Sequence, residues 1–450
     1  MSRRNLTHGE VLHRLAQLSL PMAWGVFMVL SFYLVDTFFI GLLGTRELAA
    51  ISFTFPVVSA TASIAMGLGV GALSVISRTI GRGDHVGGRR YATHSLMLAL
   101  LVVGLFVVLG LATIDPLFRA LGAGEELLPM IRQYMELWYA GMIFLVVPMV
   151  GNSIIRASGD ARFPSLIMTI AAVSNLILDP LLIFGLAGFP RLELQGAAWA
   201  SLVSRAITLL ASLYVLHFRL KLIDFSFPAW SSLFQSWKKI LHIGLPAAAT
   251  NMIAPVLTGL LTTIVAQYGS SAVAAFGVAS RIEMFFLVPF VALSAGLGPF
   301  MGQNFGAKKF SRLREAIRLG TLFSLLWGGL ITVLCWFAAE WIVQTINKES
   351  EVVVYGVLYL TLVPMSYGAI GVIYAASASF NALGSPLSAS LLALTRTFFL
   401  TVPLAWLGHT FWGLPAVFGA ISLANLLVGG VAFFWIRHQT GPKLSGQITP

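Results

Sequence analysis

Long apolar runs occupy almost the whole of this chain and limit its possible folds more than any other feature. Each run approaches the ~20 residues that a helix needs to cross the hydrocarbon core of a bilayer. Lipid offers no hydrogen-bond partner to the backbone, so such segments cross a membrane as helices. The sequence therefore predicts an all-α integral membrane protein with twelve transmembrane helices, at residues 16–43, 48–76, 92–114, 128–150, 163–186, 196–216, 240–267, 272–301, 317–340, 353–377, 387–408 and 412–436.

The composition supports the same prediction. Hydrophobic residues make up 58% of the 450 residues and charged residues only 10%, whereas soluble domains carry about 25% charged residues. The spans and their links leave no segment for a soluble domain. Cys335 is the single cysteine and lies in an apolar run, so no disulfide framework or cysteine metal site is expected. We expect no metal and no cofactor apart from a coupling ion.

The distribution of Lys and Arg predicts the orientation. Alternate links place 20 of the 28 cations on one side, and the positive-inside rule assigns that side, with both termini, to the cytoplasm. The net charge of +11 is mostly this topology signal and requires no nucleic-acid partner. The expected location is therefore a membrane whose inner side faces the cytoplasm. The cations are Arg3, Arg4, Arg14, Arg78, Arg82, Arg89, Arg90, Arg156, Arg162, Arg219, Lys221, Lys238, Lys239, Lys308, Lys309, Arg312, Arg314, Arg318, Arg437 and Lys443.

An internal repeat appears at an offset of 225 residues. Parallel repeats of this kind form two lobes, and such transporters hold substrate between their halves and work by rocking them. We therefore expect two six-helix lobes related by a pseudo-twofold axis, at residues 1–218 and 240–450, with a cytoplasmic linker at 219–239. The matching segments are Leu20-Pro21 with Leu245-Pro246, Gly44 and Leu48-Ala49-Ala50 with Gly269 and Val273-Ala274-Ala275, Ser77–Gly81 with Gly302–Gly306, and Arg156–Gly159 with Asn381–Gly384.

Two carboxylates interrupt the apolar runs, Asp36 in the first and Asp179 in the fifth. A charge at the centre of a spanning helix costs about 2.5–3.5 kcal/mol on insertion scales, so such residues are by default functional. Asn175 and Asp179 lie four residues apart and therefore share one helix face, and Asp36 can face them from the first helix. Burial and a neighbouring carboxylate both favour the protonated, neutral form of an aspartate side chain. The two aspartates could therefore carry a proton, or the oxygens of the three side chains could hold sodium.

The chain resembles the multidrug and toxic compound extrusion (MATE) transporters along its whole length, and within them the DinF-type bacterial branch. The NorM-type branch places further acidic residues in the seventh and tenth spans, where residues 245–269 and 352–380 contain none here. The motifs that carry the resemblance are Leu20-Pro21 before Asp36, Gly81, Arg156–Asp160, Asn175–Pro180, Gly196-Ala197-Ala198 and Ala279–Glu283.

The resemblance implies roles for several residues. Asp36 and Asp179 would couple transport to an ion, with Asn175 beside them. Tyr134 and Asn152, at the two ends of the fourth span, match polar positions around this site. Ser201 stands where the family usually has Thr. Pro21 would bend the first helix, and we expect that bend to change when Asp36 is protonated. Structural alternatives are helix-to-helix hydrogen bonding for Asn175 and Asp179 and an interfacial position for Tyr134.

Four further cations fall inside spans. Arg132 has Glu136 one turn away as an expected partner, and Arg281 is expected to pair internally or reach the interface. Arg205 and Arg396 would favour anionic cargo if they lined the cavity, which the sequence does not decide.

Three functions follow as hypotheses. The first is export of amphiphilic, largely cationic drugs and dyes, coupled to protons or sodium, by a monomer embedded in the lipid bilayer. The second is a flippase for lipids or lipid-linked oligosaccharides. The third is a membrane-embedded enzyme, against which stands the absence of catalytic motifs and of a Walker A sequence. The run Gly67–Gly71 lies inside a span, where close helix packing explains it better than phosphate binding.

Overall fold

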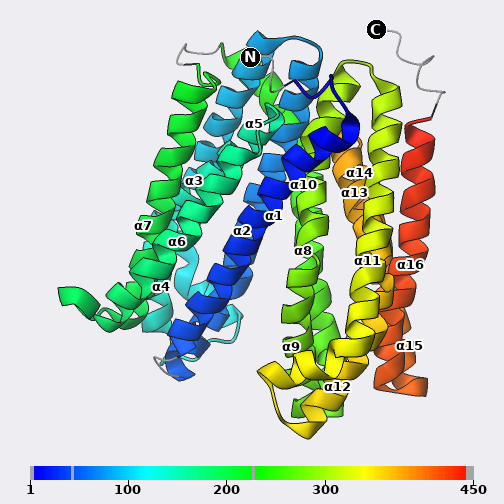
Figure 1. Ribbon diagram of the computed structural model, residues 1–450. Helices are drawn as coiled ribbons and strands as arrows, with labels where there is room; N and C mark the ends of the chain where they lie inside the picture. The colour runs from blue at the N-terminus through cyan, green and yellow to red at the C-terminus, as the bar shows by residue number, and fades with distance from the viewer. Residues whose placement is uncertain (1–4, 42–44, 225–228, 442–450) are drawn as a thin grey trace. The chain divides into compact units, whose positions relative to one another are not determined.

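The computed structural model describes residues 5–41, 45–224 and 229–441 and confirms the all-α prediction (Figure 1). No strand occurs in these ranges. The elements are α1 (Val11–Gly41), α2 (Thr45–Gly81), α3 (His85–Ala120), α4 (Leu128–Ala140), α5 (Met142–Ala157), α6 (Arg162–Phe184), η2 (Leu186–Gly188), α7 (Glu193–Tyr214), η3 (Val215–Arg219), α8 (Trp230–Val265), η4 (Ala266–Tyr268), α9 (Ser270–Phe286), α10 (Val288–Gly306), α11 (Phe310–Ile346), α12 (Ser350–Leu362), η5 (Val363–Ser366), α13 (Tyr367–Leu383), α14 (Pro386–Leu394), η6 (Thr395–Thr401), α15 (Val402–Trp412) and α16 (Leu414–Gln439).

Ten stretches of helix among the described residues are long and apolar enough to cross a membrane, and two bent pairs bring the number to twelve. The pair α4–α5 bends by 44° at Gly141, and the pair α9–α10 bends by 43° near Leu287. The span α12–α13 is interrupted by the short helix η5, which contains Pro364. Proline lacks a backbone donor and loosens a helix at such a point. The twelve predicted spans therefore correspond to these helices, although not all of them are straight.

The chain forms two compact units. Of the described residues, the first unit contains those in 24–248, and the second contains Asn5–Ala23 and those in 249–441. The start of α1 thus packs with the second unit, while the part of α1 that bears Asp36 packs with the first. The predicted lobe boundaries stay a prediction.

Within the first unit, small residues let α2 and the start of α8 approach closely, which confirms the packing role expected for Gly67–Gly71. A Cβ atom added at Gly71 would lie 3.1 Å from the backbone nitrogen of Gly244, and one added at Gly244 would lie 3.0 Å from the carbonyl oxygen of Gly67. Both distances are shorter than ordinary carbon contacts. The linker is anchored to α3 of the same unit, since Thr93 accepts a hydrogen bond from the Asp224 backbone and Trp237 donates one to the carbonyl of His94.

The second unit holds the segment that precedes α1. The backbone nitrogen of Leu6 donates to Gln303 Oε1 at 3.1 Å, and Arg312 Nη1 donates to the carbonyl of Gly9 at 2.6 Å. Asn304, which is fully buried, donates to the carbonyl of Leu6. These bonds fix the start of α1 against the junction of α10 and α11.

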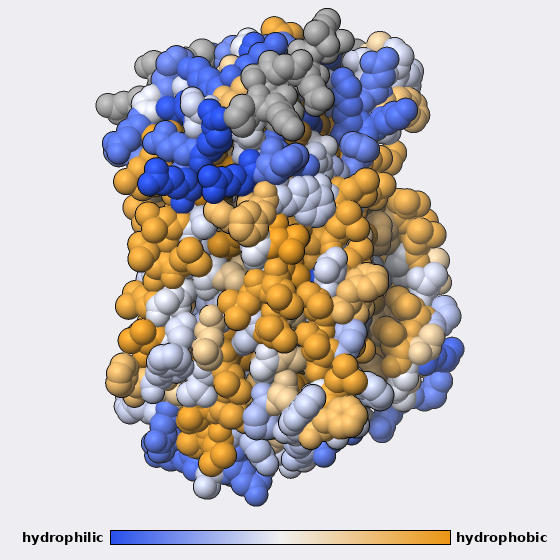
Figure 2. Space-filling view, turned by 90° about the vertical axis from the view of Figure 1, so that its right-hand side faces the viewer, coloured by the Kyte–Doolittle hydropathy of each residue, from blue (hydrophilic) through white to orange (hydrophobic). Residues whose placement is uncertain are grey.

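Figure 2 shows hydrophobic residues over the middle of the visible face, with hydrophilic residues gathered toward its two ends. Such a band is the surface that lipid tails require. Large apolar side chains on the exposed faces of α11, α15 and α16 include Leu326, Phe337, Trp406, Val431 and Phe434. Several residues used in the predictions lie outside the described part, namely Arg3, Arg4, Gly44, Lys443 and the side chains of Arg46 and Leu48-Ala49-Ala50.

Candidate functional site

The acidic pair begins with one face of α6. Asn175 and Asp179 are both buried, at 3% and 0% exposure, and Asn175 Nδ2 donates a 2.7 Å hydrogen bond to Asp179 Oδ1. Residues four apart on a helix lie one above the other, which is why the sequence spacing predicted this contact. Pro180 follows directly and removes one backbone donor from α6. Asp179 is therefore held in a fixed orientation by its own helix.

Asp36 meets this pair from α1 of the same unit. Its carboxyl group lies close to the Asp179 carboxyl, near enough for each to act on the other electrostatically. Asp36 Oδ1 and Asp179 Oδ2 are buried and have no hydrogen-bond partner among the described residues. Two carboxyl groups this close share a hydrogen bond only when one of them carries a proton, because two charged acceptors repel. The predicted convergence of Asp36, Asn175 and Asp179 thus agrees with the geometry.

Arg205 and Tyr134 complete this cluster. The guanidinium of Arg205, half-buried on α7, lies close enough to Asp36 and Tyr134 to act on both electrostatically. Ser204, the residue before it, donates a 2.7 Å hydrogen bond to the Ala171 carbonyl and thereby ties α7 to α6. The Tyr134 hydroxyl in turn lies within electrostatic range of Asp36 and Asp179. A positive charge beside the acidic pair is the feature that sequence reasoning did not place.

The other expected site residues have weaker connections to the pair. Ser201 lies one turn before Arg205 on α7 and so shares its face, but no hydrogen bond joins it to the acids among the described residues. Asn152 lies on α5, beyond the bend at Gly141, and its buried Oδ1 has no hydrogen-bond partner in the described ranges. Pro21 lies inside α1, in the part that packs with the second unit.

Comparison with known proteins decides the family. The MatE family model matches residues 21–181 and 246–407, two blocks that begin 225 residues apart, as the internal repeat does. The chain belongs to the MATE family.

Relatives cover nearly the full length of this MATE transporter. It is 38% identical over 440 residues to a FAD transporter of Shewanella oneidensis, covering 98% of this chain and 97% of that protein. It is 26% identical to the multidrug export protein MepA of Staphylococcus haemolyticus, with 92% and 91% covered. The crystal structure of the Vibrio cholerae MATE transporter VcmN in its bent form matches with a TM-score of 0.90 at 30% identity, covering 96% and 97% of the two chains. The protein is a multi-pass membrane transporter and not an enzyme, as the sequence predicted.

The second unit of this MATE transporter contains another buried polar cluster. Tyr359 of α12 donates a hydrogen bond to Glu283 of α9, and Arg396 of η6 lies within electrostatic range of Glu283. Tyr359 occupies the position in the second half that Tyr134 occupies in the first, because the two numbers differ by the repeat offset. The repeat offset could therefore have identified Tyr359 as a candidate site residue from the sequence alone. The sequence analysis named Glu283 only as the last residue of the motif Ala279–Glu283, and the side chain of Arg281 in that motif is exposed.

Ion pairs stabilise the links at the ends of the first unit. Arg132 contacts Glu136 at 3.5 Å, which confirms the expected pair, and also binds Asp115. Arg119 donates from Nε to Glu125 Oε1 at 2.8 Å, in the link between α3 and α4. This hydrogen bond, together with the positive charge of Arg119, holds the pKa of the Glu125 carboxyl below its usual value.

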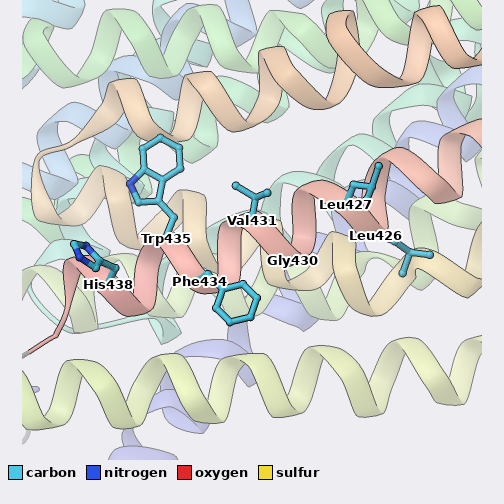
Figure 3. Close-up of a pocket in the computed structure, with 7 residues that line it drawn as sticks. All are labelled: Leu426, Leu427, Gly430, Val431, Phe434, Trp435 and His438. Carbon is cyan, nitrogen blue, oxygen red and sulfur yellow. The ribbon is translucent and has the colours of Figure 1, made fainter.

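One open groove of about 720 Å³ lies along α16 (Figure 3). All of its lining residues come from that single helix, and His438 is the only one with a titratable side chain. Trp435 packs against Phe380 of α13 with 5.3 Å between ring centroids. This groove is apolar and holds no charged group at membrane depth, so it suits lipid contact and offers nothing to recognise a coupling ion. It is lined by Leu426, Leu427, Gly430, Val431, Phe434, Trp435 and His438.

Proposed function

We propose that this MATE transporter is a proton-coupled secondary active exporter, with Asp36 and Asp179 as its coupling site. The observation that carries the proposal is the closeness of two carboxyl groups, the buried Asp179 and the half-buried Asp36, beside the half-buried Arg205. One bound proton changes the charge of this cluster by a full unit in surroundings of low dielectric, where a charge acts strongly on its neighbours. Uptake and release of that proton can therefore bias α1 between two arrangements.

Sodium is the alternative coupling ion. Carboxylate and amide oxygens suit hard cations, and Asp36, Asp179 and Asn175 offer such oxygens. The fixed positive charge of Arg205 opposes the binding of either cation to the pair, so the sodium-free arm of the experiment below distinguishes the two ions. Apart from the coupling ion, the proposed cycle uses no cofactor.

For the cargo, we favour a flavin dinucleotide over a cationic drug. The Shewanella oneidensis relative, named a FAD transporter, shares 38% identity over almost the full length, whereas the multidrug relative from Staphylococcus haemolyticus shares 26%. FAD carries a negatively charged pyrophosphate, and Arg205 and Arg396 place positive charge inside the spans. A guanidinium is the side chain best suited to a phosphate group.

Export of amphiphilic cations is the second candidate, and it is favoured by the multidrug relatives. The acidic pair would then exchange a proton for a cation at the same carboxylates. A lipid flippase would also use the buried arginines, and it is separated from the first two by the lipid arm of the experiment on Arg396 below.

The proposed setting is the bacterial cytoplasmic membrane, with both termini on the cytoplasmic side and the monomer as the working unit. The basic residues Lys309 and Arg312 bind the segment before α1, which supports placing that end of the second unit at the cytoplasmic surface.

The test uses purified protein in sodium-free proteoliposomes with an imposed pH gradient. Movement of FAD, riboflavin and a fluorescent lipophilic cation would be followed separately for the wild type, Asp36→Asn and Asp179→Asn. The exposed carboxylate variant Glu10→Gln serves as the matched control. We expect FAD movement driven by the gradient in the wild type and the control, and its loss in both Asp variants.

Three other results of this experiment would change the proposal. FAD movement that persists in Asp36→Asn would overturn the coupling assignment. Movement only after sodium is added would transfer the coupling to that ion. Movement of the cation but not of FAD would replace the first cargo by the second candidate.

A further inference from the structure

The second unit holds a buried polar cluster that the coupling site does not use, formed by Glu283, Tyr359, Tyr374 and Arg396. Glu283 lies on α9, Tyr359 on α12, Tyr374 on α13 and Arg396 in η6, so four separate elements converge on it. Tyr359 donates to Glu283, and Arg396 acts electrostatically on both Glu283 and Tyr374. Arg396 lies near the middle of the span 386–412. The cluster therefore lies inside the membrane-spanning part of the second unit.

Several buried polar atoms in and beside this cluster have no hydrogen-bond partner among the described residues. An arginine donates several hydrogen bonds and accepts none, and Arg396 Nε is buried without a partner among the described residues. The same holds for the hydroxyl groups of Tyr367 and Thr397, both of which are fully buried. Glu283, the one carboxylate here, already accepts from Tyr359. A buried donor left unsatisfied is costly, so the cluster lacks an acceptor that some bound group could supply.

The backbone around Arg396 is also unusual. Residues Thr395–Thr401 form a π-helix, which is rare and occurs frequently at functional sites. Thr401 Oγ1 donates a 2.7 Å hydrogen bond to the Arg396 carbonyl and supports the widened turn. The widening interrupts the regular hydrogen-bond ladder of the span at Arg396 and Thr397.

We propose, on the basis of the flavin cargo proposed above, that Arg396 is the centre of a binding site for the phosphate groups of the cargo. The guanidinium binds phosphate oxygens in a bidentate, charge-assisted manner, and the tyrosine hydroxyls beside it are additional donors. The Glu283 carboxylate competes with such a phosphate group for the positive charge of the Arg396 guanidinium. A bound phosphate group would contact the Arg396 guanidinium directly, whereas Glu283 acts on it only electrostatically among the described residues.

The phosphate could belong to a nucleotide cargo or to a lipid headgroup, and the chemistry is the same for both. The probes are therefore FAD, FMN, riboflavin, inorganic pyrophosphate and a fluorescent phosphatidylglycerol. Riboflavin has the flavin ring without phosphate, so it reports on the rest of the binding site. Binding of the soluble probes would be measured by fluorescence or calorimetry on the full-length protein, and lipid movement in proteoliposomes.

The variants are Arg396→Gln, Arg396→Lys and Glu283→Gln, with Arg281→Gln as a matched control because Arg281 is exposed on α9. For Arg396→Gln we expect the affinity for FAD and FMN to fall by roughly ten- to a hundredfold, as for loss of charged hydrogen bonds, with riboflavin unchanged. Arg396→Lys should bind FAD and FMN more tightly than Arg396→Gln but less tightly than the wild type. Lysine keeps the positive charge but lacks the paired donors of the guanidinium. Glu283→Gln should tighten FAD binding.

Equal losses for FAD and riboflavin in Arg396→Gln would show a merely structural role and overturn the proposal. So would unchanged affinity for every phosphate-bearing probe. If the wild type does not transport FAD, the proposed cargo fails, but saturable pyrophosphate binding that is lost in Arg396→Gln still supports the phosphate site. Movement of phosphatidylglycerol that depends on Arg396, without FAD binding, would identify a lipid headgroup as the source.

Discussion

Asn175 donates a 2.7 Å hydrogen bond to Asp179 one turn further along α6, and this contact aligns the carboxyl group that lies beside Asp36. The bond satisfies one oxygen of Asp179 and leaves the other buried oxygen without a partner among the described residues. One oxygen is thus fixed in place while the other is available for a proton. The orientation of the Asp179 carboxyl group therefore depends on Asn175.

Asn175→Ala should weaken transport driven by a pH gradient. A hydrogen bond to a charged group contributes about 1.5–3 kcal/mol, so we expect the gradient-driven rate to fall about tenfold or more. Leu176→Ala, on the exposed face of the same turn, should leave the rate near that of the wild type. Transport rates in proteoliposomes measure the difference. Equal rates for Asn175→Ala and the wild type would contradict a role in orienting Asp179.

Pro21→Ala should slow transport without weakening the binding of cargo. Pro21 lies inside α1 and cannot donate to the carbonyl one turn earlier, which leaves the helix easier to bend. Alanine restores that bond and favours a straight helix, so we expect a several-fold lower turnover. Pro116→Ala, a second proline inside a helix, is the control. Unaltered transport in Pro21→Ala would remove the hypothesis that the bend of α1 takes part in the cycle.

Gly71→Val should destabilise the first unit. A Cβ atom at Gly71 would already lie 3.1 Å from the backbone nitrogen of Gly244, and extra atoms forced into packed contacts cost about 1–3 kcal/mol. Gly104→Val is the matched control, because no atom lies within 4 Å of a Cβ atom placed there. Thermal unfolding of the detergent-solubilised protein should give a lower Tm for Gly71→Val alone. An equal Tm for the two variants would show that α2 and α8 can separate without loss.

Arg119→Gln should raise the pKa of Glu125 toward its ordinary value near ~4.3, because the hydrogen bond and the positive charge that lower it are removed. A carboxyl group whose pKa is lower in the folded state contributes stability above its unfolded pKa, and that stability is lost as the pH falls through the folded pKa. The stability of wild type and variant should therefore converge on acidification. The effect is small, since both side chains are exposed. Tm values measured across the acidic range check this, and a gap that widens as the pH falls would contradict it.

Much of the fold follows from the sequence because membrane spans are local features. Run length and composition predicted the helices around α3, α6, α11 and α16, and the four-residue spacing predicted the contact between Asn175 and Asp179. The bends at Gly141 and near Leu287 were not predicted. Gly141 and Pro289 lie at these points and weaken a helix locally, but whether a span bends there also depends on which neighbouring helices pack against each half of it.

The sequence by itself determined the membrane class, the helix count and the apolar setting of Asp36 and Asp179, since run length and composition act within one segment. Only the tertiary structure placed Arg205 beside Asp36, joined Tyr359 to Glu283, and assigned the start of α1 to the second unit. Each of these contacts joins residues far apart in the chain. Which faces of two helices meet is decided by the packing of all their neighbours together, so no single segment contains that information.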